Sequence, residues 1–76
     1  MFHNFYRIVT TAVPMDCRMP ILDGLQDSYH SFNESRSPVP GLENAIARLY
    51  NVPENRDVQY LITQLGRLVS FYKETY

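Results

Sequence analysis

The stretch VQYLITQLGRLVSFY, residues 58–72, is the most regular part of this 76-residue sequence. Its apolar residues recur every three or four positions, which is the spacing of one face of an α-helix. That apolar stripe consists of Val58, Leu61, Ile62, Leu65, Leu68, Val69 and Tyr72. Pro53 suits a first helical turn, and Lys73 near the other end is favourable for the helix dipole. The sequence therefore predicts a helix over about residues 54–74.

The segment just upstream repeats the helical pattern. Leu42, Ala45, Ile46 and Leu49 share one face and predict a shorter helix over about residues 41–51. Only a few residues around Pro53 separate the two helices, and so short a connection makes consecutive helices antiparallel neighbours. We therefore expect residues 41–75 to form a C-terminal αα-hairpin.

A further helix and an exposed connector are expected before this hairpin. Pro20 suits a first helical turn, and one apolar face follows it. That face consists of Leu22, Leu25, Tyr29 and Phe32. Gly24 weakens the helix by about 1 kcal/mol relative to alanine. Residues 31–40 are rich in serine and proline, so they are expected to form an exposed connector.

The N-terminal segment, residues 5–13, leaves two alternatives open. Its β-branched and aromatic residues favour a strand. Phe5, Ile8, Val9 and Ala12 also satisfy helical spacing. A single strand would find a partner only across a dimer interface, so we favour a helix. The predicted fold is one small all-α domain spanning residues 1–76, a helical bundle of three or four helices.

The small size of the chain points to a partner. A chain this short buries only roughly 60% of the surface that its unfolded form exposes, so its stability is marginal. Cys17 is the single cysteine, which excludes an internal disulfide. His3 and His30 complete no metal-ligand spacing with it, so we expect no metal and no cofactor. Self-association or another protein remains as the source of additional stability.

Charge and hydropathy argue against nucleic-acid and membrane partners. The net charge is −1, and the seven basic residues are spread along the chain without a basic run. Binding to nucleic acid requires a concentrated positive surface, so we do not expect it. No apolar run approaches the roughly 20 residues that span a bilayer. The N-terminal stretch lacks a basic leader, so we expect a cytoplasmic protein.

One short motif, residues 16–24, reads DCRMPILDG. It resembles the phosphoacceptor loop of response-regulator receiver domains, D-x-x-M-P-x-x-D-G. The resemblance implies that Asp16 is phosphorylated, at the end of a strand formed by residues 8–13. Receiver domains also hold Mg²⁺ with an earlier acidic pair and use a lysine late in the fold. No acidic residue precedes Asp16, and Lys73 is the only lysine, so the charge of phosphoryl transfer has no stabilising group.

The predicted C-terminal helix carries a second set of side chains opposite its apolar stripe. Tyr60, Gln64, Arg67 and Phe71 point away from the stripe, and aromatic and arginine residues are enriched at interface hot spots. Two explanations stay open: the N-terminal segment covers the aromatic residues, or a partner does. We predict that these four residues bind a partner. Gly66 lies on the flank of the helix, where a small residue would let another backbone approach.

These observations predict a small helical regulatory or adaptor protein that acts by binding another protein, as a homodimer. The alternative from a different class is a structural subunit of a larger assembly. A divergent receiver phosphorylated at Asp16 is the least favoured hypothesis. We find no nucleophile, base and acid in an indicative spacing, so we do not expect an enzyme.

Overall fold

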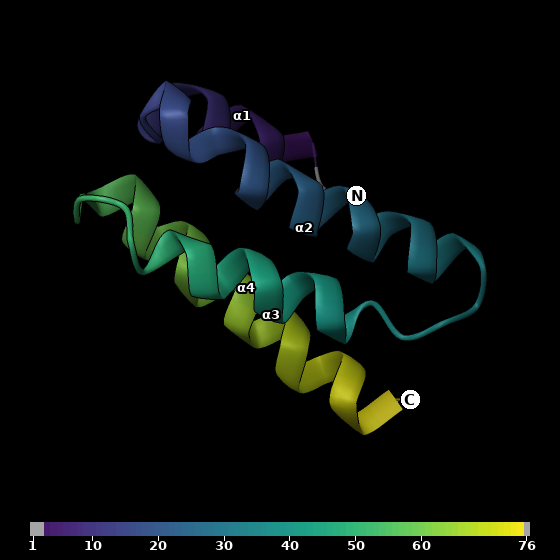
Figure 1. The fold of residues 1–76 in the computed structure, drawn as a ribbon. Coiled ribbons are helices and arrows are strands. Elements are labelled where there is room, and N and C mark those ends of the chain that lie inside the picture. The colour runs from purple at the N-terminus through teal and green to yellow at the C-terminus, as the bar shows by residue number, and fades with distance from the viewer. Residues whose placement is uncertain (1–2, 76) are drawn as a thin grey trace.

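The computed structural model describes residues 3–75 and contains four α-helices in that range (Figure 1). They are α1 (His3–Ala12), α2 (Met15–Asn33), α3 (Val39–Leu49) and α4 (Arg56–Thr75). The predicted all-α class is therefore confirmed. The N-terminal segment is a helix from His3 to Ala12, so the strand alternative for this segment is wrong.

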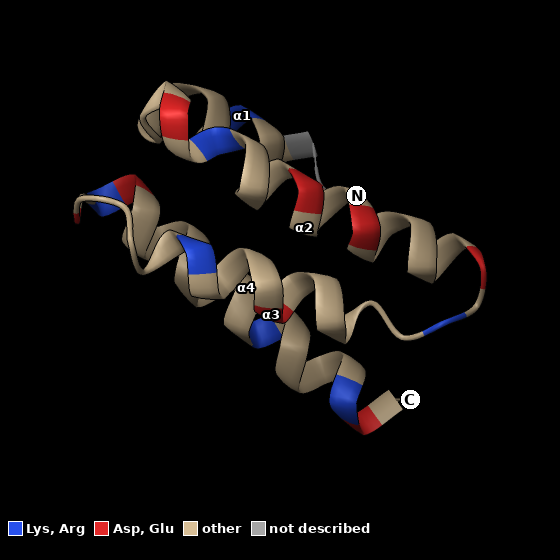
Figure 2. Cartoon of the chain, viewed as in Figure 1, with Lys and Arg blue, Asp and Glu red and all other residues tan. Residues whose placement is uncertain are grey.

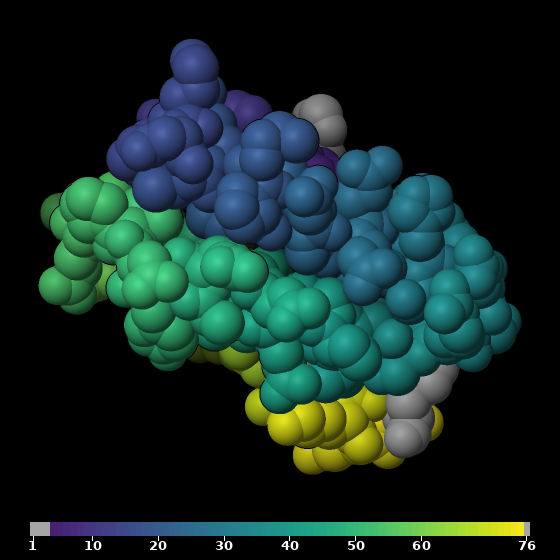
Figure 3. Space-filling view, viewed as in Figure 1, coloured from purple at the N-terminus to yellow at the C-terminus, as the bar shows by residue number. Residues whose placement is uncertain are grey.

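Each helix packs against two others. Among residues 3–75, α2 contacts α1 and α3, and α4 contacts α3 and α1, while the remaining two pairs lie diagonally opposite. Consecutive helices run in opposite senses, so α3 and α4 form the helical pair expected over residues 41–75 (Figure 1). The bundle measures 32 × 19 × 19 Å. Figure 3 shows α2 and α3 in continuous contact along one face, with α4 emerging beneath α3.

The core draws apolar side chains from all four helices. Its buried members are Val9, Val13, Ile21, Leu25, Val39, Leu42, Ala45, Leu49, Val52, Val58, Leu61, Leu65, Val69 and Tyr72. The stripe predicted on the last helix faces this core, with only Ile62 and Leu68 half-buried. The rings of Phe32 and Tyr72 meet edge to face across the bundle, with centroids 5.9 Å apart. The sequence pattern thus identified the buried side of α4 correctly.

Helix α2 differs from its prediction at both ends. It begins at Met15 rather than at Pro20, so the proline lies inside the helix. Proline has no N–H, and the carbonyl of Asp16 therefore lacks its usual helical donor. Both residues are exposed, so water can take the place of that donor. The connector after α2 comprises residues 34–38 rather than 31–40, and Pro38 and Val39 are buried.

The buried face of α2 is also rotated relative to the predicted one. Gly24 and Ser28 are buried beside Leu25, whereas Tyr29 is 42% exposed. The cause is a close backbone contact with α3. A Cβ atom on Gly24 would lie 2.9 Å from the carbonyl oxygen of Gly41, and one on Gly41 would lie 2.6 Å from that of Gly24. These two glycines allow α2 and α3 to touch, a role that helix propensity alone does not reveal.

The start of α4 is fixed by one capping residue. The Asn55 side-chain oxygen accepts a hydrogen bond from the Val58 N–H at 2.9 Å, which satisfies an otherwise free donor of the first turn. The Asn55 side-chain amide also donates to the Ala12 carbonyl at 3.4 Å. At the corner between α1 and α2, Arg18 Nε donates a hydrogen bond to the Val13 carbonyl at 2.8 Å. Asn55 therefore ties the beginning of α4 to the end of α1.

Ser28 provides a test of this packing. Its hydroxyl is completely buried and has no hydrogen-bond partner among the described residues. A buried hydroxyl without a partner costs free energy, and alanine is the better helix former. We expect Ser28→Ala to raise the free energy of unfolding by about 1 kcal/mol, measured by urea denaturation.

The exposed Ser70 on α4 supplies the matched control, because Ser70→Ala changes helix propensity without changing a buried hydroxyl. We expect a gain below about 0.5 kcal/mol there. A loss of stability in Ser28→Ala would mean that the hydroxyl does find a partner in solution.

Candidate partner-binding surface

The four residues predicted to bind a partner lie along one outward side of α4; together they are called the α4 surface below. Tyr60 is 53% exposed and Phe71 is 59% exposed. Arg67 is exposed between them, and Gln64 is partly buried. The rise of an α-helix places the two aromatic residues roughly 16 Å apart along the axis. Helix α1 packs against α4 but leaves both rings more than half exposed, so it does not cover them.

The ring of Phe71 contacts one buried ring, that of its neighbour in the chain. Its ring meets that of the buried Tyr72 edge to face, with centroids 5.3 Å apart. Edge-to-face contacts of this kind are favourable and restrict the orientation of the ring. A restricted ring loses less side-chain entropy when a partner binds it. Phe71 is therefore well suited to a contact residue.

Gly66 does not belong to this surface. Successive helical residues are separated by 100°, which turns Gly66 about 120° away from Tyr60. A Cβ atom at Gly66 would have no neighbour within 4 Å, so nothing in the described chain requires a glycine there. A single helix contact cannot be centred on both Gly66 and the two aromatic residues.

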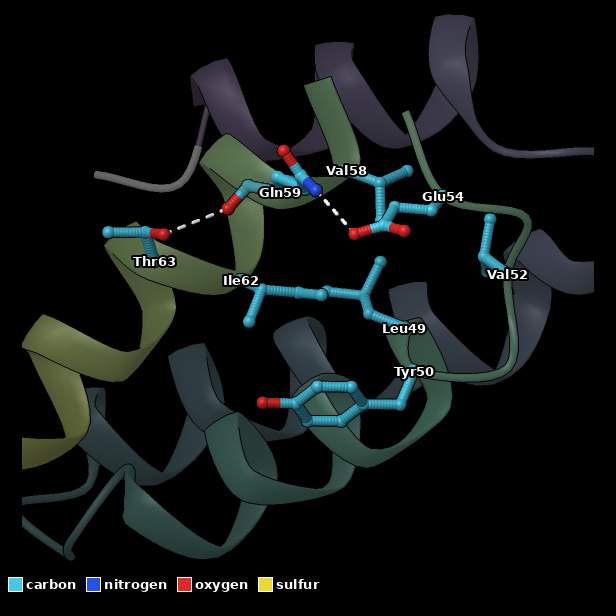
Figure 4. Close-up of a pocket in the computed structure, with 8 residues that line it drawn as sticks. All are labelled: Leu49, Tyr50, Val52, Glu54, Val58, Gln59, Ile62 and Thr63. Carbon is cyan, nitrogen blue, oxygen red and sulfur yellow. Dashed lines mark hydrogen bonds between the residues drawn. The ribbon is translucent and has the colours of Figure 1, made fainter. Parts of the chain in front are cut away.

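A separate apolar niche, which was not predicted from the sequence, lies where α3 turns into α4 (Figure 4). It has a volume of about 540 Å³ and is lined by Leu49, Tyr50, Val52, Glu54, Val58, Gln59, Ile62 and Thr63. The ring of Tyr50, which is 72% exposed, lies opposite the Ile62 side chain (Figure 4). The shape of the niche depends on residues 50–55, which follow no helical period.

The niche carries one charged side chain. The Gln59 amide donates a hydrogen bond to the Glu54 carboxylate, and the Thr63 hydroxyl donates to the Gln59 carbonyl at 2.9 Å (Figure 4). These bonds hold the polar rim together above an apolar floor. The niche can accommodate an apolar side chain, but it presents no arrangement of groups for chemistry.

A polar cleft lies between α2 and α3, above their close contact. It has a volume of about 510 Å³ and is lined by Pro20, Asp23, Gly24, Asp27, Asn44 and Arg48. The two carboxylates lie one helical turn apart on α2, and the guanidinium of Arg48 lies across from them on α3. Because both signs of charge line it, the cleft selects no single class of charged ligand.

The context of the receiver-like motif does not match the family that it resembles. Asp16 lies in the first turn of a helix and is exposed, and residues 8–12, which the resemblance required to be a strand, are helical. Residues 3–75 contain no β-strand that could form the central sheet of a receiver. The fold that the resemblance implies is therefore absent from the described residues, and phosphorylation of Asp16 stays the least favoured prediction.

The other candidate chemical groups are dispersed. The pKa of the half-buried Cys17 thiol is raised, first by burial and second by the neighbouring Asp16 carboxylate. A raised pKa disfavours the reactive thiolate. His30 is exposed on α2, and the side chain of His3 lies outside the described part of the chain. Within the described range, no three His, Cys, Asp or Glu residues lie close enough to hold a metal ion.

Surface charge and helix hydropathy are both unremarkable. Helices α2, α3 and α4 each carry both acidic and basic residues, and α1 carries Arg7 alone, so neither sign gathers in one continuous run (Figure 2). Two ion pairs within residues 3–75 join exposed groups, Arg36 with Glu34 and Lys73 with Glu43 at 3.4 Å. None of the helices described is both long and apolar enough to cross a membrane.

Comparisons with protein-family models, with curated proteins and with solved structures found no match for this chain. The surface itself must therefore supply the argument for function.

Proposed function

We propose that this protein works by binding other proteins through the α4 surface, and that it does so as a homodimer. The observation that supports this most directly is the exposure of Tyr60 and Phe71 on one side of one helix, with Arg67 between them. Aromatic and arginine side chains are the residue types that most often dominate binding energy at interfaces. A small helical adaptor or regulator would use such a surface.

Burial of these rings would add stability that the domain cannot obtain from its own core. Covering a ring removes a large apolar area from water, and each Å² contributes about 25 cal/mol. A single-core domain of this size has only about 3–5 kcal/mol in total. Two rings on each protomer would therefore add appreciably to the stability of the dimer over that of the monomer.

Exposed apolar side chains elsewhere support a second candidate, a structural subunit of a larger assembly. Met15 and Met19 on α2 are 77% and 63% exposed, and Tyr50 is exposed in the turn between α3 and α4. An orphan subunit that needs several surfaces covered should aggregate when purified alone. A regulator should stay soluble and folded, so purification of the chain by itself separates the two candidates.

The proposal makes a prediction about association. Light scattering should find the wild type as a dimer at micromolar concentration, and Tyr60→Ala combined with Phe71→Ala should weaken the dimer roughly 100-fold or more. Circular dichroism should remain helical, because both side chains are more than half exposed.

Met19→Ala combined with Tyr50→Ala is the matched control, since it removes two exposed apolar side chains outside the α4 surface. This control variant should remain dimeric. A wild type that stays monomeric and stable would contradict dimerisation. A dimer that persists in the Tyr60 and Phe71 double variant would contradict the choice of surface.

A further inference from the structure

We propose that the α4 surface is complementary to itself in one orientation, so that a second copy binds it with the two α4 helices antiparallel about a two-fold axis. In this arrangement Tyr60 of one copy lies opposite Phe71 of the second, and Gln64 lies opposite Arg67 of the second. This inference rests on the proposed function, and it adds the orientation and the register of the pair.

The spacing along α4 carries the argument. The intervals from Tyr60 to Gln64, from Gln64 to Arg67 and from Arg67 to Phe71 are four, three and four residues. This alternation keeps the residues on one narrow stripe of the helix, as in paired helices of a coiled coil. The sequence of intervals also reads the same in both directions. Its midpoint lies between Leu65 and Gly66, so a two-fold axis there exchanges the aromatic positions and exchanges the inner polar positions.

The side chains that this axis brings together have compatible chemistry. Each end of the stripe joins an aromatic ring to another aromatic ring, a favourable contact beyond its buried area. In the middle, the Gln64 carbonyl can accept a hydrogen bond from the Arg67 guanidinium of the second copy. Arg67 makes no ion pair with another described residue, so its donors are available for that bond.

Charge at the ends of α4 favours the same orientation. Arg56 and Glu74 are exposed, carry opposite charge and lie about one turn outside the stripe. They lie nearly equidistant from the midpoint and, at 100° per residue, on the same flank of the helix. The antiparallel axis therefore sets Arg56 of each copy near Glu74 of the other. Neither residue has an ion-pair partner within the described chain.

A parallel pair would be less favourable. It would place Arg67 near its own counterpart, and it would leave Arg56 of one copy roughly 27 Å along the axis from Glu74 of the second. Opposed like charges disfavour an interface. The antiparallel pair avoids this opposition, brings Arg56 near Glu74 of the other copy and keeps the aromatic contacts.

The test uses two full-length variants with charges at the two aromatic positions. Tyr60→Lys places an ammonium opposite position 71 of the second copy, and Phe71→Glu places a carboxylate opposite position 60. An equimolar mixture of Tyr60→Lys with Phe71→Glu should form a one-to-one heterodimer, detected by native mass spectrometry and by sedimentation of a fluorescently labelled chain. In the matched control mixture, Phe71→Lys replaces Phe71→Glu. The control mixture should associate at least roughly 10-fold more weakly than the first mixture.

The outcomes separate this inference from the proposed function. In a parallel pair positions 60 and 71 lie roughly 16 Å apart along the axis, so the sign of the charge at position 71 would hardly matter. Equal association of the two mixtures would overturn the antiparallel register, even where loss of dimer in Tyr60→Ala with Phe71→Ala upholds the surface. A wild type without any dimer would overturn both. Circular dichroism of each variant establishes that it is folded.

Discussion

Gly41→Ala is expected to lower the free energy of unfolding by about 2–3 kcal/mol. A Cβ atom at this position would lie 2.6 Å from both the Gly24 carbonyl oxygen and the Ser28 nitrogen, and 2.9 Å from the Ser28 Cα. All three atoms belong to the backbone of α2, so no side-chain rotation relieves the overlap. The two helices must move apart, which loosens the contact between α2 and α3. Urea denaturation followed by circular dichroism measures the effect.

Gly66→Ala is the control, since it makes the same change inside another helix. Nothing lies within 4 Å of a Cβ atom at Gly66, so the substitution meets open space. Alanine there should stabilise the protein by about 0.5–1 kcal/mol through helix propensity. The two substitutions are thus expected to have opposite signs. Equal effects at both positions would show that α2 and α3 do not approach as closely as described.

The contact between Gly24 and Gly41 also shows what could and could not be predicted from the sequence. Local periodicity was sufficient for α3 and α4, because their buried residues recur at helical spacing and each helix buries one side. Gly24 looked like a weak point of its helix, since propensity considers one helix at a time. Its contact with Gly41 depends on which helices meet and at what distance, and periodicity contains neither quantity.

The start of α2 illustrates a competing local rule. Pro20 favours the first turn of a helix, and the prediction placed it there. The structure begins the helix at Met15, because Pro14 and the corner bonded by Arg18 already turn the chain. The proline then lies on the exposed side, where its missing hydrogen bond costs little. The preference of proline for the first helical turn was therefore overridden by the geometry of the corner between α1 and α2.

The α4 surface and the niche near Tyr50 also differ in whether the sequence predicts them. The outward position of Tyr60 and Phe71 followed from sequence, because residues opposite a buried stripe must face away from the core. The niche near Tyr50 did not, since it depends on how residues 50–55 bring the end of α3 to the start of α4. Only a signal of tertiary structure could have found it.

Leu65→Ala is expected to destabilise the protein by about 2–5 kcal/mol. Leu65 is completely buried at the middle of α4, where the core receives side chains from all four helices. Removing its isobutyl group leaves a cavity, and close-packed neighbours relax into such a space only in part. A domain of this size has about 3–5 kcal/mol to lose, so the variant is expected to be largely unfolded at 25 °C.

Leu68→Ala makes the same change one turn away on a half-buried side chain, and it supplies the internal comparison. Part of the Leu68 side chain is already in water, so its removal loses less apolar burial and leaves no closed cavity. We expect a cost of about 1 kcal/mol, with a cooperative thermal transition retained. If the two variants unfold at similar urea concentrations, the core is not centred on Leu65. In that case α4 would be rotated about its axis relative to the structure, and the outward position of Tyr60, Gln64, Arg67 and Phe71 would fail with it.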